Sequence, residues 1–263
     1  QPNVPLDAEG AARWAPWRDP RPLERLVALS VASAQRQGTT SSHPSLLIWP
    51  ENSAPFYFES DPIFRRAVEE MARAGHSFVV LGTVNFADRE QSRPPTSAVV
   101  LDPDGRVALT YDKIHLVPFG EYVPRWGLPG LVGKITHEAG EFVPGTDYRS
   151  AQTPQGALAV FICYEAIFPQ LVRRLTPEGP GVLVNISNDA WFGDTGAPYQ
   201  HLAMARLRAI ETGRYLLRAT NDGVTAVIDP HGRIVEQLPR HVVAVLAGRF
   251  DFRAGRTFYA TYG

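Results

Sequence analysis

The sequence is poor in several residue types that mark a function by themselves. It has one cysteine and two methionines among 263 residues, and its net charge is −1. One cysteine cannot form an intramolecular disulfide, and a balanced charge gives no field that attracts nucleic acid. The seven histidines have no ligand-like spacing. We therefore expect neither a metal site nor a nucleic-acid partner.

Long hydrophobic runs are also scarce. The longest mostly apolar stretch, residues 156–168, is too short to span a bilayer and contains Glu165. Nothing at Gln1 resembles a signal peptide, and residues 1–5 resemble the end of a strand whose first half is absent. We therefore expect a domain excised from a longer protein. A Gly-x-Ser-x-Gly elbow is absent as well, which argues against a serine hydrolase.

What the sequence does contain is an alternation of short apolar runs with helical patterns. Hydrophobic residues make up 44% of the chain, which is enough for a large core. The pattern predicts an α/β domain with helices packed over the strands, and no break in composition calls for a second domain. Helices are expected at 23–37, 62–74, 168–175 and 198–213; strands at 46–49, 78–82, 157–162, 182–186, 215–220, 224–229, 233–238 and 241–248; and a hairpin at 97–101 and 106–111.

Polar residues follow three of the apolar runs: Glu51, Lys113 and Cys163. Sites in α/β sheets are built at the carboxyl ends of strands. Acyl transfer through a thiol needs a base, a cation or N–H donors for the oxyanion, and the nucleophile. These three residues provide one of each, with the backbone N–H of Tyr164 as a second oxyanion donor. Taken singly, each of the three is as readily a solvated or structural group.

The single cysteine lies where a buried strand gives way to a short helix. A thiol at this position faces the positive end of the helix dipole, which predicts a lowered pKa and a better nucleophile. The alternative is a buried structural cysteine.

Motifs along nearly the whole chain resemble the nitrilase, or carbon–nitrogen hydrolase, superfamily, and within it the branch of apolipoprotein N-acyltransferases. The superfamily's Glu-Lys-Cys order is carried by Trp49-Pro50-Glu51, Lys113-Ile114-His115 and Cys163-Tyr164-Glu165. The likeness to the branch rests on longer segments, which are residues 116–124, 185–193, 200–211, 218–223 and 257–263.

The resemblance implies a single-domain αββα sandwich over residues 1–263, without a cofactor. It also implies that Cys163 is the nucleophile, Glu51 the general base and Lys113 the stabiliser of the tetrahedral intermediate, with support from Glu121, Tyr164 and Glu165. Each supporting residue also has a plain structural interpretation. Glu121 would be a solvated loop carboxylate, Tyr164 a core side chain, and Glu165 a complement to a helix dipole.

The branch implies a phospholipid acyl donor, a diacylated lipoprotein acceptor and a membrane surface as partners. It also implies a place at the bacterial inner membrane, with the domain facing the periplasm and attached to transmembrane helices that this sequence lacks. Substrate-binding candidates are Trp14, Phe119 and Trp191, although Trp191 is equally a core residue. The apolar loop 116–135 is either packed on its own domain or an arm against a membrane. A soluble amidase and a non-catalytic binding module are the alternative functions.

Overall fold

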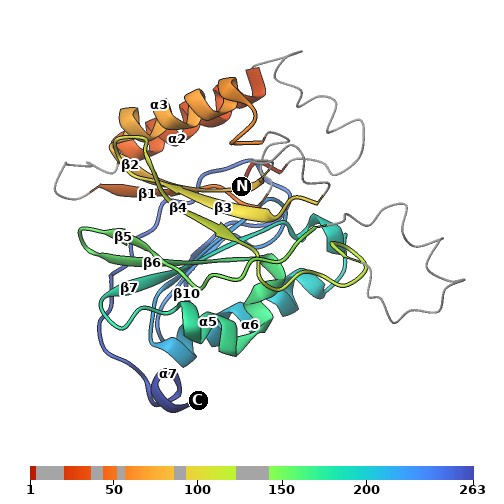
Figure 1. Cartoon of the computed structure of the whole chain (residues 1–263), viewed down its shortest axis with the longest axis vertical. Helices are drawn as coiled ribbons and strands as arrows, with labels where there is room; N and C mark the ends of the chain where they lie inside the picture. The colour runs from red at the N-terminus through yellow and green to blue at the C-terminus, as the bar shows by residue number, and fades with distance from the viewer. Residues whose placement is uncertain (4–20, 37–43, 52–56, 86–92, 123–141) are drawn as a thin grey trace, which may run out of the picture.

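A computed structural model describes residues 1–3, 21–36, 44–51, 57–85, 93–122 and 142–263 (Figure 1). Trp14 and residues 123–135 of the expected apolar loop lie outside these ranges. Among the described helices, none is long and apolar enough to cross a membrane.

Two β-sheets stack face to face, and helices cover the outer face of each (Figure 1). The first sheet has the order β1-β2-β3-β4, with β1 and β2 parallel and the other pairs antiparallel. Its strands are β1 (Ser45–Ile48), β2 (Ser77–Val84), β3 (Thr96–Leu101) and β4 (Val107–Asp112).

The first sheet is covered by α2 (Arg21–Arg36) and α3 (Pro62–Gly75). The start of α3 follows from its sequence, because Asp61 caps the helix by accepting from the N–H groups of Ile63 and Phe64, and proline suits the first helical position. Apolar side chains from α3, among them Phe64 and Val68, pack on Val79 and Leu81 of β2 and bury this layer.

The second sheet has the order β10-β9-β8-β7-β6-β5, and its central strands β6, β7 and β8 are parallel. The strands are β5 (Ala151–Thr153), β6 (Gly156–Ile162), β7 (Gly181–Ser187), β8 (Leu216–Thr220), β9 (Ala226–Ile228) and β10 (Ile234–Gln237). Near-continuous apolar runs form the parallel centre, as expected for strands that are buried on both faces.

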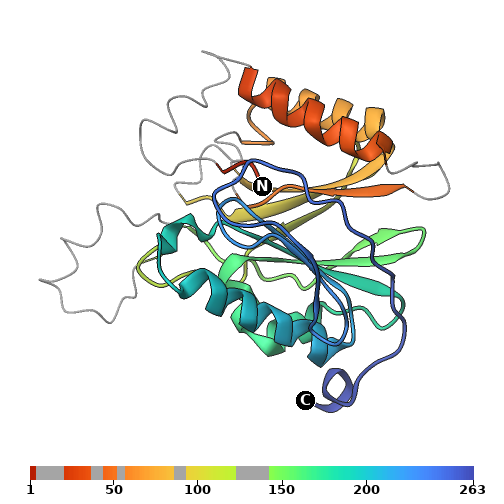
Figure 2. The same ribbon diagram turned by 180° about the vertical axis from the view of Figure 1, so that it is seen from behind.

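The outer face of the second sheet is covered by α5 (Pro169–Leu175) and α6 (Ala197–Thr212). Figure 2 shows α6 lying along this sheet and the segment after β10 running toward the C-terminal helix α7 (Phe258–Tyr262). Two 3-10 turns, η1 (Cys163–Ile167) and η2 (Asp189–Phe192), follow β6 and β7.

Between the sheets, residues such as Val80, Val100 and Val160 form the main core. The expected αββα sandwich is confirmed.

Several details differ from the expectation, including the short helix α7, which was not expected. Residues 241–248 form no strand; their side chains alternate between partial and full exposure, and Ala244 exchanges backbone hydrogen bonds with Gln1. The edge strand β5 was not expected, since three residues are too few for a periodic signal. The expected helix 168–175 is preceded by the separate turn η1, because Pro169 begins a new helix.

Candidate active site

Strand ends from both sheets meet at one edge of the sandwich. Glu51 follows β1 and Lys113 follows β4 in the first sheet, while Cys163 follows β6 in the second. All three are buried. The structure therefore brings together residues that lie between 50 and 112 positions apart in the chain.

Lys113 is enclosed between two carboxylates. Its Nζ lies 3.1 Å from Glu51 Oε1 and 2.8 Å from Glu121 Oε1, and its side chain is 1% exposed. Burial alone would lower the pKa of Lys113, but the surrounding negative charges, Glu51 first among them, outweigh burial and raise it. The ammonium is therefore permanently charged.

The second oxygen of each carboxylate is bound by backbone. The N–H of Asn188, just after β7, donates to Glu51 Oε2 over 3.0 Å, and the N–H of Val117 donates to Glu121 Oε2 over 2.7 Å. Burial raises the pKa of Glu121, and the charge of Lys113 opposes that rise. Glu121, whose side chain is 14% exposed, is thus a largely enclosed partner of Lys113 rather than a loop carboxylate in water.

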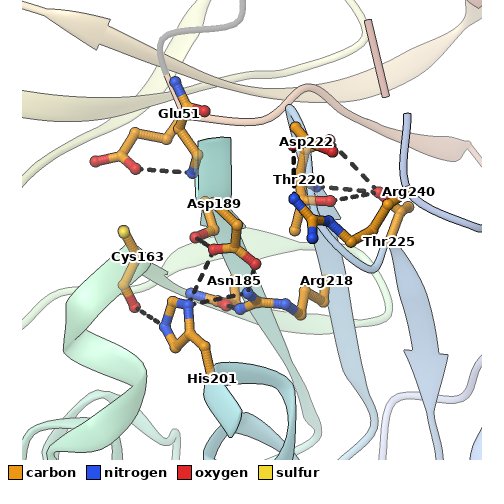
Figure 3. A network of polar contacts seen from close by, with 12 residues as sticks. Glu51, Cys163, Asn185, Asp189, His201, Arg218, Thr220, Asp222, Thr225 and Arg240 are labelled. Atoms are coloured by element: carbon orange, nitrogen blue, oxygen red, sulfur yellow. Dashed lines mark hydrogen bonds and ion pairs between the residues drawn. The ribbon is translucent and has the colours of Figure 1, made fainter. Parts of the chain in front are cut away.

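The thiol of Cys163 lies beside this cluster. The residue is 7% exposed and has a positive φ of 50°, which is rare for a residue with a side chain. Figure 3 shows its sulfur on the side of the Glu51 carboxylate. Burial and the charge of Glu51 raise the pKa of the thiol to about 12, although the charge of Lys113 opposes them.

The expectation of a lowered thiol pKa is therefore wrong. It relied on a helix dipole, but the residue begins the short turn η1, and burial next to a carboxylate has the larger effect. At neutral pH the group is a neutral thiol. An attack by sulfur then requires that a neighbouring base accept the proton, and Glu51 is the carboxylate on that side.

Glu165 binds the backbone next to Lys113 and Cys163. Its carboxylate accepts from the Tyr111 hydroxyl and from the backbone N–H groups of Ile114, His115 and Ile162, at 2.7–3.2 Å. Burial raises its pKa to about 7 against these four donors. The carboxylate thereby joins the residue before Cys163 to the two residues after Lys113, which is a different role from complementing a helix dipole.

A second polar network, formed by Asp189, His201 and Arg218, lies under Cys163 (Figure 3). None of these residues was assigned a role from the sequence. Asp189 Oδ2 is 2.7 Å from Arg218 Nη2, and both side chains are fully buried. His201 Nδ1 is 3.0 Å from Asp189 Oδ1. Although burial opposes it, the guanidinium of Arg218 holds the pKa of Asp189 well below its usual range. The available signal was the position of Asp189, two residues after a buried strand.

The remaining candidates are not part of these contacts. Tyr164 is partly exposed, and its ring meets the edge of Phe168. Phe119 is 54% exposed, two residues before Glu121, and Trp191 is 74% exposed on η2, so Trp191 is not a core residue. Trp14 lies outside the described residues.

Two hollows lie elsewhere on the molecule. One of about 480 Å³ lies on α6, and one of about 730 Å³ is lined by residues such as Leu46, Phe78 and Phe252. Neither is lined by Glu51, Lys113 or Cys163. In the ranges that the structure describes, no group of three or more His, Cys, Asp or Glu side chains is arranged to hold a metal ion.

A thiol, a carboxylate that can take its proton and a fixed ammonium are together the components of acyl transfer through a cysteine. Their position between the two sheets of an αββα sandwich defines a class of thiol-dependent enzymes. The sequence model of the carbon-nitrogen hydrolase family matches residues 11–256. The chain belongs to the carbon-nitrogen hydrolase family.

Similar proteins carry more specific names. The chain is 40% identical to the apolipoprotein N-acyltransferase of Geobacter metallireducens over 93% of its own length and 47% of that protein's. It is 37% identical to the apolipoprotein N-acyltransferase of Rhodopseudomonas palustris, over 100% of its own length and 49% of the other. The chain thus spans about half the length of these curated relatives.

Solved structures share the fold at lower identity. An amidase from Nesterenkonia sp. AN1 superposes with a TM-score of 0.61 at 21% identity, covering 83% of this chain and 82% of that one. A carbon-nitrogen hydrolase from Helicobacter pylori gives a TM-score of 0.60 at 17% identity, covering 83% and 80%. At these identities the likeness concerns the fold alone.

The buried pair of Asp189 and Arg218 makes a stability prediction. Asp189→Asn leaves the Arg218 charge buried without its partner, so we expect the free energy of unfolding to fall by about 3–5 kcal/mol. Asp194→Asn is the matched control, because Asp194 is 88% exposed and its ion pairs are worth less than about 1 kcal/mol. Urea unfolding at neutral pH measures both, and equal losses would contradict the assignment.

The raised thiol pKa makes a kinetic prediction. The rate of alkylation of Cys163 by iodoacetamide should rise about tenfold per pH unit from neutral into mildly alkaline solution, without a plateau, because the thiolate stays scarce. A plateau near neutral pH in the unsubstituted protein contradicts the dominance of burial. Cys163→Ala gives the background.

Proposed function

We propose that this chain is the catalytic domain of an N-acyltransferase. It moves a fatty acyl chain from a phospholipid, through a thioester on Cys163, to the N-terminal amine of the diacylglyceryl-cysteine of an apolipoprotein. The observation that carries the proposal is the buried thiol beside a carboxylate and an ammonium, in a chain 40% identical to an apolipoprotein N-acyltransferase. Residues 1–263 act as one domain in this proposal.

In the first half-reaction, Glu51 takes the proton of Cys163 as the sulfur attacks an ester carbonyl of the phospholipid. The negative charge that develops on the carbonyl oxygen is stabilised by Lys113, whose ammonium is held charged by Glu51 and Glu121, and by the backbone N–H of Tyr164. The ester C–O bond breaks, the lysophospholipid alcohol takes the proton from Glu51, and a thioester remains.

In the second half-reaction, the α-amine of the diacylglyceryl-cysteine attacks the thioester. Glu51 takes a proton from the attacking nitrogen, the C–S bond breaks, and the proton returns to the sulfur. The products are an amide and the free thiol, so the cycle needs no cofactor and consumes no oxidant. Glu165 and Tyr164 support the loop that presents the thiol, and they do not exchange protons with the substrate.

Lipid substrates are favoured over small soluble amides by the exposed aromatic residues near the site. Phe119 lies two residues before Glu121, and Trp191 lies three residues after Asn188, which binds Glu51. Large apolar groups left in water at the edge of a polar site suit contact with acyl chains or a membrane surface. We therefore assign both residues to acyl-chain binding, at the periplasmic face of the inner membrane.

Intact-mass measurement tests the first half-reaction. After incubation with phospholipid in detergent micelles and no acceptor, the protein should gain the mass of one acyl chain, because the thioester has no amine to react with. Cys163→Ala should gain none, and Glu51→Gln should form the adduct at least about a hundredfold more slowly.

Addition of a diacylated lipopeptide should then remove the adduct and yield the triacylated product. An adduct of equal size in Cys163→Ala would exclude this nucleophile. Release of ammonia from small amides, with no phospholipid-derived adduct, would instead favour the amidase alternative. Amidases share this fold.

A further inference from the structure

His201 on α6 contacts the backbone of Cys163 and not its sulfur. The ring nitrogen Nε2 is 3.0 Å from the Cys163 carbonyl oxygen, in a buried position. A carbonyl oxygen only accepts hydrogen bonds, so Nε2 carries the proton whatever the charge of the ring. Figure 3 shows this carbonyl directed at His201 while the sulfur lies on the opposite side, toward Glu51.

The other side of the imidazole is fixed by the buried network. Nδ1 lies 3.0 Å from Asp189 Oδ1 and 3.1 Å from Arg218 Nη2. Asp189 is itself held by Arg218 and by the hydroxyl of Ser187, which donates to it over 2.7 Å. Gly223 closes the pocket, since a Cβ there would lie 2.5 Å from Asp189 Oδ2. Contacts at both ring nitrogens thus fix the orientation of the His201 imidazole.

An aromatic side chain also packs on the His201 ring. Phe192 of η2 meets the imidazole edge to face, with ring centres 5.9 Å apart. The ring is therefore held by a charged pair on one side and an aromatic side chain on another, and its Nε2–H bond is directed at one peptide group.

The hydrogen bond from His201 to the Cys163 carbonyl also fixes the direction of the next backbone N–H, through the peptide between Cys163 and Tyr164. A trans peptide is planar, and its C=O and N–H bonds point in opposite directions. When His201 holds the Cys163 carbonyl, the Tyr164 N–H is thereby aimed the other way, toward the side of the sulfur. That N–H is the backbone donor of the proposed oxyanion site.

We propose that His201 is a positioning residue for the oxyanion donor. By donating from Nε2 to the Cys163 carbonyl, it fixes the plane of the 163–164 peptide and aims the Tyr164 N–H at the oxygen that becomes negative during acyl transfer. This inference rests on the proposed role of Cys163 as nucleophile. It predicts that His201 matters for attack on carbonyls and not for reactions of the thiol that create no oxyanion.

Two substitutions of similar polarity separate these effects. His201→Gln has the length to place an N–H donor where Nε2 stands, whereas His201→Asn reaches only the position of Nδ1, next to Asp189. Both lose the ring and its contact with Phe192, so both should lose a similar amount of stability. His231→Gln, at an exposed turn, is the control for an unrelated histidine.

Two reactions of Cys163 are compared in each protein. Acylation by a nitrophenyl ester forms an oxyanion, releases nitrophenol and leaves a thioester; alkylation by iodoacetamide forms a C–S bond, releases iodide and forms no oxyanion. We expect His201→Asn to slow acylation by about a hundredfold or more, as loss of one oxyanion donor does, with alkylation changed less than about threefold. His201→Gln should acylate within about tenfold of the unsubstituted protein.

Equal losses in acylation and alkylation, or a glutamine variant no better than the asparagine variant, would overturn the inference. If His201→Asn does not fold, His201→Met takes its place, since it has the length of glutamine but no N–H donor. Failure of the proposed role of Cys163 as nucleophile is recognised separately, because the unsubstituted protein would then form no thioester with the nitrophenyl ester, and the inference would fall with it.

Discussion

The contact on which the site depends is the ammonium of Lys113 between Glu51 and Glu121. A buried charge is stable only when its partners are present, and here each carboxylate also takes a backbone N–H. The N–H that binds Glu51 belongs to Asn188 at the end of β7, so this contact crosses from the first sheet to the second. The geometry of the thiol site is thus fixed by the packing of the two sheets.

The same arrangement sets the protonation of the thiol. Burial is the main cause of the raised pKa of the Cys163 thiol, and the negative charge of Glu51 raises it further against the positive charge of Lys113. An enzyme with a stored thiolate would react with any electrophile that enters. A neutral thiol becomes nucleophilic only as a base removes its proton; in the proposed mechanism this couples its reactivity to a substrate carbonyl placed between Lys113 and the sulfur.

Apolar runs allowed much of the fold to be predicted, because strands buried on both faces, such as β6 and β7, are continuous in the sequence. The strand expected at 241–248 was wrong, since an apolar run does not by itself show whether a partner strand exists. The strand ends at Glu51, Lys113 and Cys163 were likewise predictable. The thiol pKa was not, because burial and neighbouring charges come from residues distant in sequence. The position of Asp189 after a buried strand was a usable signal, but His201 and Arg218 resemble ordinary helix and strand residues.

The peptide after Cys163 lies between two polar networks, one that takes part in the proposed reaction and one whose charges stay fixed. On the sulfur side, the proposed mechanism requires Glu51 to accept and return a proton while Lys113 faces a developing negative charge. On the carbonyl side, Asp189 and Arg218 form a closed pair that hardly titrates, since the pKa of Asp189 lies far below neutral. A donor that must keep its direction while charge develops next to it is best held by groups whose own charges do not change. In the proposed mechanism, one planar peptide meets both demands: the fixed pair holds its carbonyl side, and the carboxylate that takes the proton lies beside the sulfur.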